Sequence, residues 1–380
     1  MPKSDRQRRR RSAVIPLFAA CVAASSGCTS RHDVAATTGQ SPVATATRNL
    51  STSTTSSPAP TSLAMSQTPH PTSPAPVPTS PATSQAVDYV ATSVGLNTTT
   101  AAGPVSTVTR GPCGWRSGPP ARYDHVIWVW MENKNTSAVF DSKQAPFLGE
   151  IGSECGRATK YVDGGVHPSL PNYIAATSGG SQGIADDNGP SKHALTVDNI
   201  FRQVRAVGKT SRSYNEAMPA ACALTSSGRY AVKHNPAAYY VGGDDRVACQ
   251  RDDVGFDQFA VDLAGNTLAA FSLVTPNLCS DMHDCSVATG DAWLRTFVST
   301  IIDAASYRTG TTVVFIVFDE SEGAGTMPFF AVGPSVTPGT EVTATLNHGS
   351  LLAFTEDALG ISAHLGAAAS APSLAAAFGL

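Results

Sequence analysis

Two long apolar runs, each ending at a pair of acidic or amide residues, constrain the fold of this chain most. The first, "HVIWVWM", stops at Glu132-Asn133, and the second, "TTVVFIVF", stops at Asp319-Glu320. Unbroken runs rich in β-branched and aromatic residues are typical of buried parallel strands. Because functional groups gather beyond the carboxyl ends of strands in open α/β sheets, we expect both pairs at the same edge of one sheet.

Other segments extend this pattern into an alternation of strands and helices. Apolar residues recur with helical spacing in 196–208 and 291–307, and 269–277 reads as a further strand that ends in a polar cluster. Alternating strands and helices predict an α/β fold with a largely parallel sheet.

Composition divides the 380 residues into three parts. Residues 1–28 have a basic head and a short apolar run that ends in "SSGC", which predicts an export signal. The end of this signal resembles a bacterial lipoprotein box, so either Cys28 is lipidated and attaches the protein to a membrane, or the signal is a plain secretory one. Both alternatives predict a secreted or surface-anchored bacterial protein.

Residues 29–110 are dominated by Ser, Thr, Pro and Ala. This composition cannot bury enough apolar surface to offset chain entropy, and it predicts a disordered spacer. Residues 111–380 then form one large domain. The net charge of −3 and the lack of a basic stripe outside the signal give no nucleic-acid-binding surface.

Six cysteines fall in the domain, which favours three disulfides in an exported protein. Six cysteines allow 15 connectivities. A zinc site is the alternative, although no CxxC spacing occurs. We predict pairing between nearest neighbours, namely Cys113–Cys155, Cys222–Cys249 and Cys279–Cys285.

Polar residues with the chemistry of metal ligands follow the predicted strands. "LCSDMHDC" places Asp281, His283 and Asp284 between two cysteines, and His348 directly precedes an apolar helix. Carboxylate and amide oxygens with an imidazole suit a hard or borderline metal ion. The two aspartates of the short loop are expected to hold that loop rather than to bind metal.

Ser169, in "HPSLPNYIAATSGG", is either a turn residue or a nucleophile. Pro, Ser and Asn all favour turns, which supports the first interpretation. Beside a metal ion, however, a serine alkoxide could attack phosphorus, and the following helix start would supply amide donors to a phosphate.

Several segments resemble, in the same order, the phosphoesterase family of bacterial phospholipases C and acid phosphatases, within the alkaline phosphatase superfamily. They are "HVIWVWMENKNTSAVF", "HPSLPNYIAATSGG", "YNEAMP", "KHNPAAYY", "TPNLCSDMHDCSVATGDAWL" and "VFDESEG". The resemblance spans roughly residues 123–365. It implies an alkaline phosphatase-like, three-layer α/β/α fold with a largely parallel central sheet.

The resemblance also implies roles for individual residues around a divalent metal ion. Its implied metal ligands are Glu132, Asn133, Ser169, Asp319 and Glu320. Ser169 would also be the nucleophile, and His283 and His348 would contact the phosphoryl group or protonate the leaving oxygen. Phosphate would be bound by Asn188 and Asn235, the latter serving alternatively as support for the fold.

The chain departs from the phospholipase branch after the second strand, where "DESEG" replaces a histidine-containing "DEHGG". This difference favours a phosphatase and leaves no histidine-rich ligand set for a second metal. We therefore expect an exported, metal-dependent acid phosphatase that hydrolyses phosphomonoesters through a phosphoserine. The alternatives are a phospholipase C-like phosphodiesterase and a non-catalytic surface adhesin on the same fold.

Overall fold

The computed structural model describes residues 110–380. The expected export signal, Cys28 and the spacer up to residue 109 lie outside the described residues. Within the described part, no helix is both long and apolar enough to cross a membrane.

A single nine-stranded sheet forms the centre of the domain. The strands are β1 His125–Met131, β2 Gly156–Val162, β3 Ser211–Asn215, β4 Asp253–Gly255, β5 Phe271–Thr275, β6 Thr312–Phe318, β7 Met327–Val332, β8 Thr340–Val342 and β9 Leu346–Asn347. Their order is β4-β3-β5-β1-β6-β7-β2-β8, and β9 also pairs with β2. Every pair is parallel except those that β7 makes with β6 and β2.

The two apolar runs are adjacent parallel strands in the middle of this sheet, as expected. β1 and β6 pair along their whole length, from His125 opposite Thr312 to Met131 opposite Phe318. Each residue of β6 is fully buried, and so is every residue of β1 after His125. Because the two strands end in register, the polar pairs that follow them meet at one edge of the sheet.

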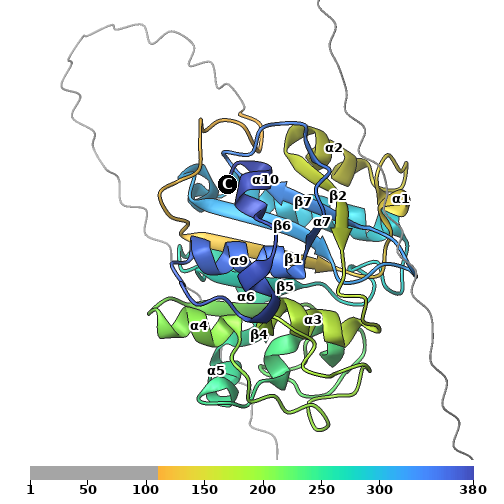
Figure 1. Cartoon of the computed structure of the whole chain (residues 1–380), viewed down its shortest axis with the longest axis vertical. Helices are drawn as coiled ribbons and strands as arrows, with labels where there is room; N and C mark the ends of the chain where they lie inside the picture. Colours follow the sequence, from red (N-terminus) through yellow and green to blue (C-terminus); the bar gives the residue numbers. More distant parts are fainter. Residues whose placement is uncertain (1–109) are drawn as a thin grey trace, which may run out of the picture. The chain divides into compact units, whose positions relative to one another are not determined.

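Helices cover both faces of the sheet (Figure 1). They are α1 Thr136–Val139, α2 Pro146–Glu154, α3 Ser169–Ser178, α4 Ile200–Ala206, α5 Asp245–Asp252, α6 Asp257–Ala264, α7 Val287–Asp303, α8 Ala305–Arg308, α9 His348–Ala358 and α10 Leu374–Phe378, with short 3-10 helices η1 Val232–His234, η2 Pro236–Tyr239 and η3 Gly366–Ser370. The helices expected over 196–208 and 291–307 are α4 and α7, the latter continued by α8, and the strand expected over 269–277 is β5.

Two consecutive residues of β7 contact the two helical layers on opposite faces of the sheet. Phe329 packs against Phe378 of α10, whereas Phe330 packs against Phe140, just ahead of α2. Successive side chains of a strand point to opposite faces, so α10 and α2 lie on opposite sides. Helix α9 packs with α3, α4 and α10 in one layer, and α2 packs with α7 in the other. The expected three-layer α/β/α architecture is confirmed.

Three disulfides join nearest neighbours in the sequence, which confirms the predicted pairing. They are Cys113–Cys155, Cys222–Cys249 and Cys279–Cys285. The third closes a loop after β5 that carries Asp281 and His283.

Candidate active site

Three buried residues from separate elements meet where β1 and β6 end. Glu132 follows β1, Asp319 follows β6, and Ser169 is the first residue of α3. The Ser169 hydroxyl donates a hydrogen bond of 3.1 Å to Oε2 of Glu132. All three side chains are almost fully buried. The structure thus joins the serine-containing segment to the strand ends that the sequence singled out.

Helix α3 aims two hydroxyl groups at Glu132. Ser169 and Tyr173 are four residues apart and therefore lie on one face of the helix. Tyr173 donates to Oε1 of the carboxylate while Ser169 donates to Oε2. The start of α3 is fixed in turn by Asp187, whose Oδ1 accepts the Leu170 N–H at 3.0 Å. Ser169 is therefore a helix-start residue held at a defined position.

The carboxyl groups at this edge repel one another when ionised. Burial, followed by the charges of Asp319 and Asp281, raises the pKa of Glu132 well above its usual value. Burial also raises the pKa of Asp319. Two buried carboxyl groups in this position need either bound protons or a cation to offset their charge.

Unpaired oxygen atoms indicate that a cation fits. Oδ1 of Asn133 and Oδ2 of Asp319 are buried and have no hydrogen-bond partner among the described residues. Asn133 has a φ of 45°, a left-handed conformation that asparagine tolerates, and its N–H donates to Oδ1 of Asp319 at 3.0 Å. Carboxylate, amide and hydroxyl oxygens are the ligands that hard divalent cations prefer. The donor set around Glu132, Asn133 and Asp319 therefore suits such an ion.

Glu320 lies beside this group and has its own partners. Its Oε2 is 2.5 Å from Nδ1 of His167 and 3.3 Å from Nδ2 of Asn172. Burial, then the charge of Asp319, raises the pKa of Glu320 to about 7. His167, two residues before Ser169, thus contacts a candidate metal ligand.

A histidine that sequence reasoning did not single out lies directly against the site. His234, in the quoted segment "KHNPAAYY", is 3.3 Å from Oε2 of Glu132 through Nε2 and 3.4 Å from Oδ2 of Asp281 through Nδ1. Its ring stacks on Tyr173 with 5.3 Å between centroids. Burial lowers the pKa of His234 to about 3. Only its position next to the predicted Asn235 gave a sequence signal.

His283 lies on the disulfide-closed loop next to His234. The two rings are 5.6 Å apart between centroids. Nδ1 of His283 is 2.7 Å from Asp284, and its backbone N–H donates to Asp281 at 2.8 Å. Asp281 therefore holds the loop, as expected, and also approaches His234. The other ring nitrogen of His283, Nε2, lies 3.5 Å from Nζ of Lys233.

His348 is buried at the start of α9, and both of its ring nitrogens contact protein groups. Nε2 is 2.7 Å from the backbone oxygen of Asp319, and Nδ1 is 3.0 Å from the Tyr161 hydroxyl. Burial lowers the pKa of His348 to about 4. These contacts orient the Asp319 backbone.

The two predicted phosphate-binding asparagines are not brought together with Ser169. Asn188 is exposed, and its side chain donates to Asp186 at 2.7 Å. Asn235 is buried and donates to Asp253 at 2.8 Å and to Tyr230 at 2.9 Å, as the alternative role in fold support requires. In the segment of Asn188, it is Asp187 that contacts the start of α3.

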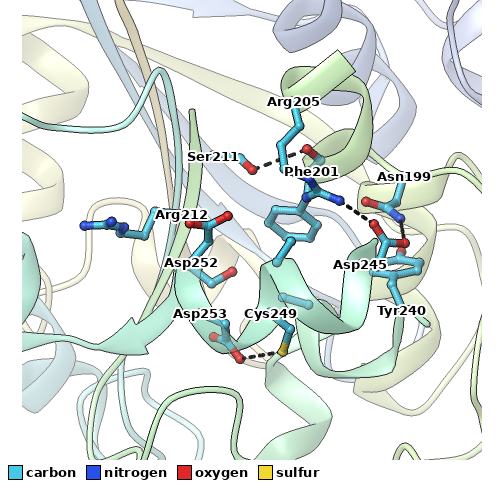
Figure 2. Close-up of a pocket in the computed structure, with 13 residues that line it drawn as sticks. Asn199, Phe201, Arg205, Ser211, Arg212, Tyr240, Asp245, Cys249, Asp252 and Asp253 are labelled. Atoms are coloured by element: carbon cyan, nitrogen blue, oxygen red, sulfur yellow. Dashed lines mark hydrogen bonds and ion pairs between the residues drawn. The ribbon is translucent and has the colours of Figure 1, made fainter. Parts of the chain in front are cut away.

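A small cavity, of about 20 Å³, lies among α4, α5 and β3, away from this site (Figure 2). The carboxylate of Asp245 in its wall already has partners, since it accepts from Asn199 at 2.9 Å and from Arg205 at 2.6 Å. Cys222 and Cys249, which lie near Asp253, are bonded to each other and offer no thiolate to a metal. We interpret this region as structural.

A largely parallel α/β/α fold with a serine hydroxyl among buried carboxyl groups at its carboxyl edge suits a hydrolase. The family comparison then identifies the bond that is hydrolysed as a phosphoric ester, because the model of the Phosphoesterase family matches residues 115–362. The chain belongs to the Phosphoesterase family and is a hydrolase of phosphoric esters.

Relatives with assigned names are phosphatases. The chain is 29% identical over 242 residues to a phosphatidylinositol-3-phosphatase of Mycobacterium tuberculosis, covering 63% of this chain and 78% of that protein. It is 29% identical over 209 residues to an acid phosphatase of Aspergillus fumigatus, covering 52% and 45%. A phosphate-repressible acid phosphatase of Penicillium chrysogenum is 27% identical over 210 residues, covering 53% and 48%. The chain thus spans about half the length of these fungal relatives.

Solved structures with a similar fold are less similar to this chain in sequence. A lipoteichoic acid synthase of Listeria monocytogenes aligns with a TM-score of 0.48 and 11% identity, covering 66% of this chain and 75% of that chain. A member of the alkaline phosphatase superfamily from Vibrio parahaemolyticus aligns with a TM-score of 0.44 and 12% identity, covering 63% and 69%.

Proposed function

We propose that this protein is an exported, metal-dependent acid phosphatase that hydrolyses phosphomonoesters through a phosphoserine at Ser169. The observation that supports the proposal most is the 3.1 Å hydrogen bond from Ser169 to Glu132 within a buried carboxyl cluster. The names of the relatives, all phosphatases, support a phosphomonoester as substrate. Three disulfides support an extracytoplasmic location.

The proposed metal site comprises Glu132, Asn133, Ser169, Asp319 and Glu320. A divalent cation there would lower the pKa of the serine hydroxyl and offset charge on the phosphoryl group. The two unpaired buried oxygens, on Asn133 and Asp319, support this assignment. His348 serves as a positioning residue, because its ring nitrogens contact the Asp319 backbone and the Tyr161 hydroxyl.

In the first step, Oγ of Ser169 forms a bond to phosphorus while the bond from phosphorus to the ester oxygen breaks. The serine proton leaves along its hydrogen bond to Glu132, and the departing alcohol takes a proton from His283, the candidate proton carrier. In the second step, water attacks the phosphoserine and gives a proton to His283. Ser169 recovers its proton from Glu132, and phosphate is released.

Two variants separate the nucleophile from the metal site. Ser169→Ala is expected to lower turnover of 4-nitrophenyl phosphate by at least about 1,000-fold at any metal concentration, because it removes the covalent pathway. Asp319→Asn also loses activity, but excess divalent metal restores part of it, because the change weakens metal binding. Glu154→Gln, at an exposed carboxylate, is the matched control.

Three results would contradict the proposal. Near-normal turnover by Ser169→Ala would make Ser169 a turn residue and a metal-activated water the attacking group. Faster wild-type hydrolysis of diesters than of monoesters would favour the phospholipase C-like alternative. No hydrolysis of either ester by the metal-loaded wild type would favour the adhesin.

A further inference from the structure

Lys233 is a cation at the rim of the candidate active site. It lies in η1 directly before His234, and its side chain is 21% exposed. Its Nζ is 2.9 Å from Oδ2 of Asp187 and 3.5 Å from Nε2 of His283. None of the roles assigned above uses this charge.

The contacts of Lys233 close a ring of interacting residues. The ring begins at Ser169 and ends at Leu170, the next residue of α3. Asp187 accepts the N–H of Leu170, the residue after Ser169, with its other carboxylate oxygen. On the far side, Glu132 contacts both Ser169 and His234, and the His234 ring lies against His283. The ring consists of Ser169, Glu132, His234, His283, Lys233, Asp187 and Leu170.

The charges around this ring are unevenly arranged. Glu132 lies on one side of the ring, and Lys233, paired with Asp187 at 2.9 Å, lies on the other. Burial lowers the pKa of Lys233, but the ion pair with Asp187 and the charges of Glu132 and Asp319 hold it above its usual value. Lys233 therefore carries its charge near the N-terminus of α3, where the helix dipole favours an anion and where Asp187 supplies one.

A second metal ion is the competing explanation for this cluster. One atom each of Glu132, His234 and His283 lie within 4.8 Å of one another, a spacing that could hold a cation. Lys233 argues against it, because an ammonium 3.5 Å from the His283 nitrogen would repel a metal bound there and cannot itself be a ligand. The arrangement favours an anion held by Lys233 near the start of the segment that carries Ser169.

We propose that Lys233 binds the phosphoryl group and sets the preference for phosphomonoesters over diesters, an inference that rests on the proposed function and deepens it. A monoester carries close to two negative charges at neutral pH, because the second pKa of its phosphate is about 6, whereas a diester carries one. A fixed cation at the rim of the site that reaches the phosphoryl group therefore stabilises the monoester more. Asp187 pairs with Lys233 when the phosphoryl group is absent.

The first test measures binding of inorganic phosphate to the metal-loaded full chain by calorimetry. Lys233→Met is expected to raise the dissociation constant by about 10- to 100-fold, the value of one charge-assisted hydrogen bond. Lys233→Arg keeps the charge and should bind within about threefold of wild type, which guards against a folding defect in the methionine variant. Lys160→Met removes the same charge from an exposed strand position and should leave affinity unchanged.

The second test compares kcat/KM for 4-nitrophenyl phosphate and bis(4-nitrophenyl) phosphate. Lys233→Met is expected to lower the value for the monoester at least about tenfold more than that for the diester. Equal losses on both esters, or an unchanged phosphate affinity, would overturn the role of Lys233. These results would leave the proposed function intact if Ser169→Ala remained inactive, whereas an active Ser169→Ala would contradict the function itself.

Asp187→Asn separates phosphate binding from a purely structural ion pair. Asparagine keeps an oxygen for the Leu170 N–H but removes the anion that competes for Lys233. We therefore expect phosphate to bind at least as tightly as in wild type. A loss of affinity equal to that of Lys233→Met would show that the pair only shapes the loop, and would overturn the proposal.

Discussion

At the scale of single residues, the buried carboxylates of this protein differ in the groups that offset their charge. Asp245 and Asp262 are paired with arginines, for example Arg205 to Asp245 at 2.6 Å, and serve the fold. Glu132 and Asp319 instead face each other, and in the described part of the chain neither pairs with a lysine or arginine. Their close approach to each other, together with the missing counter-charge, supports them as candidate ligands of a cation.

Asp253 is a buried carboxylate whose ionisation should make stability depend on pH. Burial raises its pKa to about 7 from 3.8. The folded state therefore binds a proton that the unfolded state has lost between these values, so this contribution to stability is complete below pH 3.8 and declines as pH rises to about 7. The change Asp253→Asn removes the titration.

We expect the Tm of Asp253→Asn to fall less than that of wild type between pH 5 and about pH 8. The new amide can be accommodated, because Oδ1 of Asn215 and Oδ1 of Asn235 lack partners within the described residues and either side-chain amide can turn to accept from it. Thermal unfolding at equal metal content measures the difference. Parallel Tm curves for the two proteins would show that Asp253 does not titrate in this range.

At the scale of secondary-structure elements, the strand ends were predictable, whereas the start of α3 was not. Unbroken apolar runs defined β1 and β6, so the sequence predicted that Glu132 and Asp319 would meet. Ser169 was ambiguous, because Pro, Ser and Asn favour turns as well as helix starts. His234 and Lys233 lie in a short 3-10 helix that leaves no periodic pattern, so their approach to Glu132 and Asp187 depends on tertiary packing alone.

Helix α2 shows such a tertiary effect, because its first turn is capped from another helix. Asp291 of α7 is buried, and its carboxylate accepts the N–H groups of Phe147 at 3.0 Å and Leu148 at 2.9 Å. The residue before the helix, Ala145, has no side chain that could do so. Asp291 thus joins two helices of one layer.

Asp291→Ala is expected to lower the free energy of unfolding by about 1–3 kcal/mol, because it leaves two buried N–H groups without an acceptor. Ser286→Ala removes the exposed N-cap of α7, which bonds the Thr289 N–H, and should cost about 1 kcal/mol or less. Denaturant unfolding of both variants gives the comparison. An equal or smaller loss for Asp291→Ala would mean that water replaces the carboxylate at α2.

At the scale of the whole molecule, the candidate site is assembled from segments far apart in the sequence. The sheet brings together residues near 132 and 319, α3 supplies residue 169, and the Cys279–Cys285 disulfide holds the loop with His283. The fold class and disulfides followed from composition, strand pattern and cysteine order. The contacts that surround Ser169 did not, because they join segments around residues 132, 169, 187, 234, 283 and 319.

The central claim is that phosphoryl transfer proceeds in two displacements through Ser169. The stereochemical course at phosphorus tests it most directly, with a monoester made chiral by oxygen isotopes as the donor and an alcohol as the acceptor. Each displacement inverts phosphorus, so attack by Ser169 followed by attack of the acceptor predicts overall retention of configuration. Overall inversion would show a single direct displacement and would contradict the account.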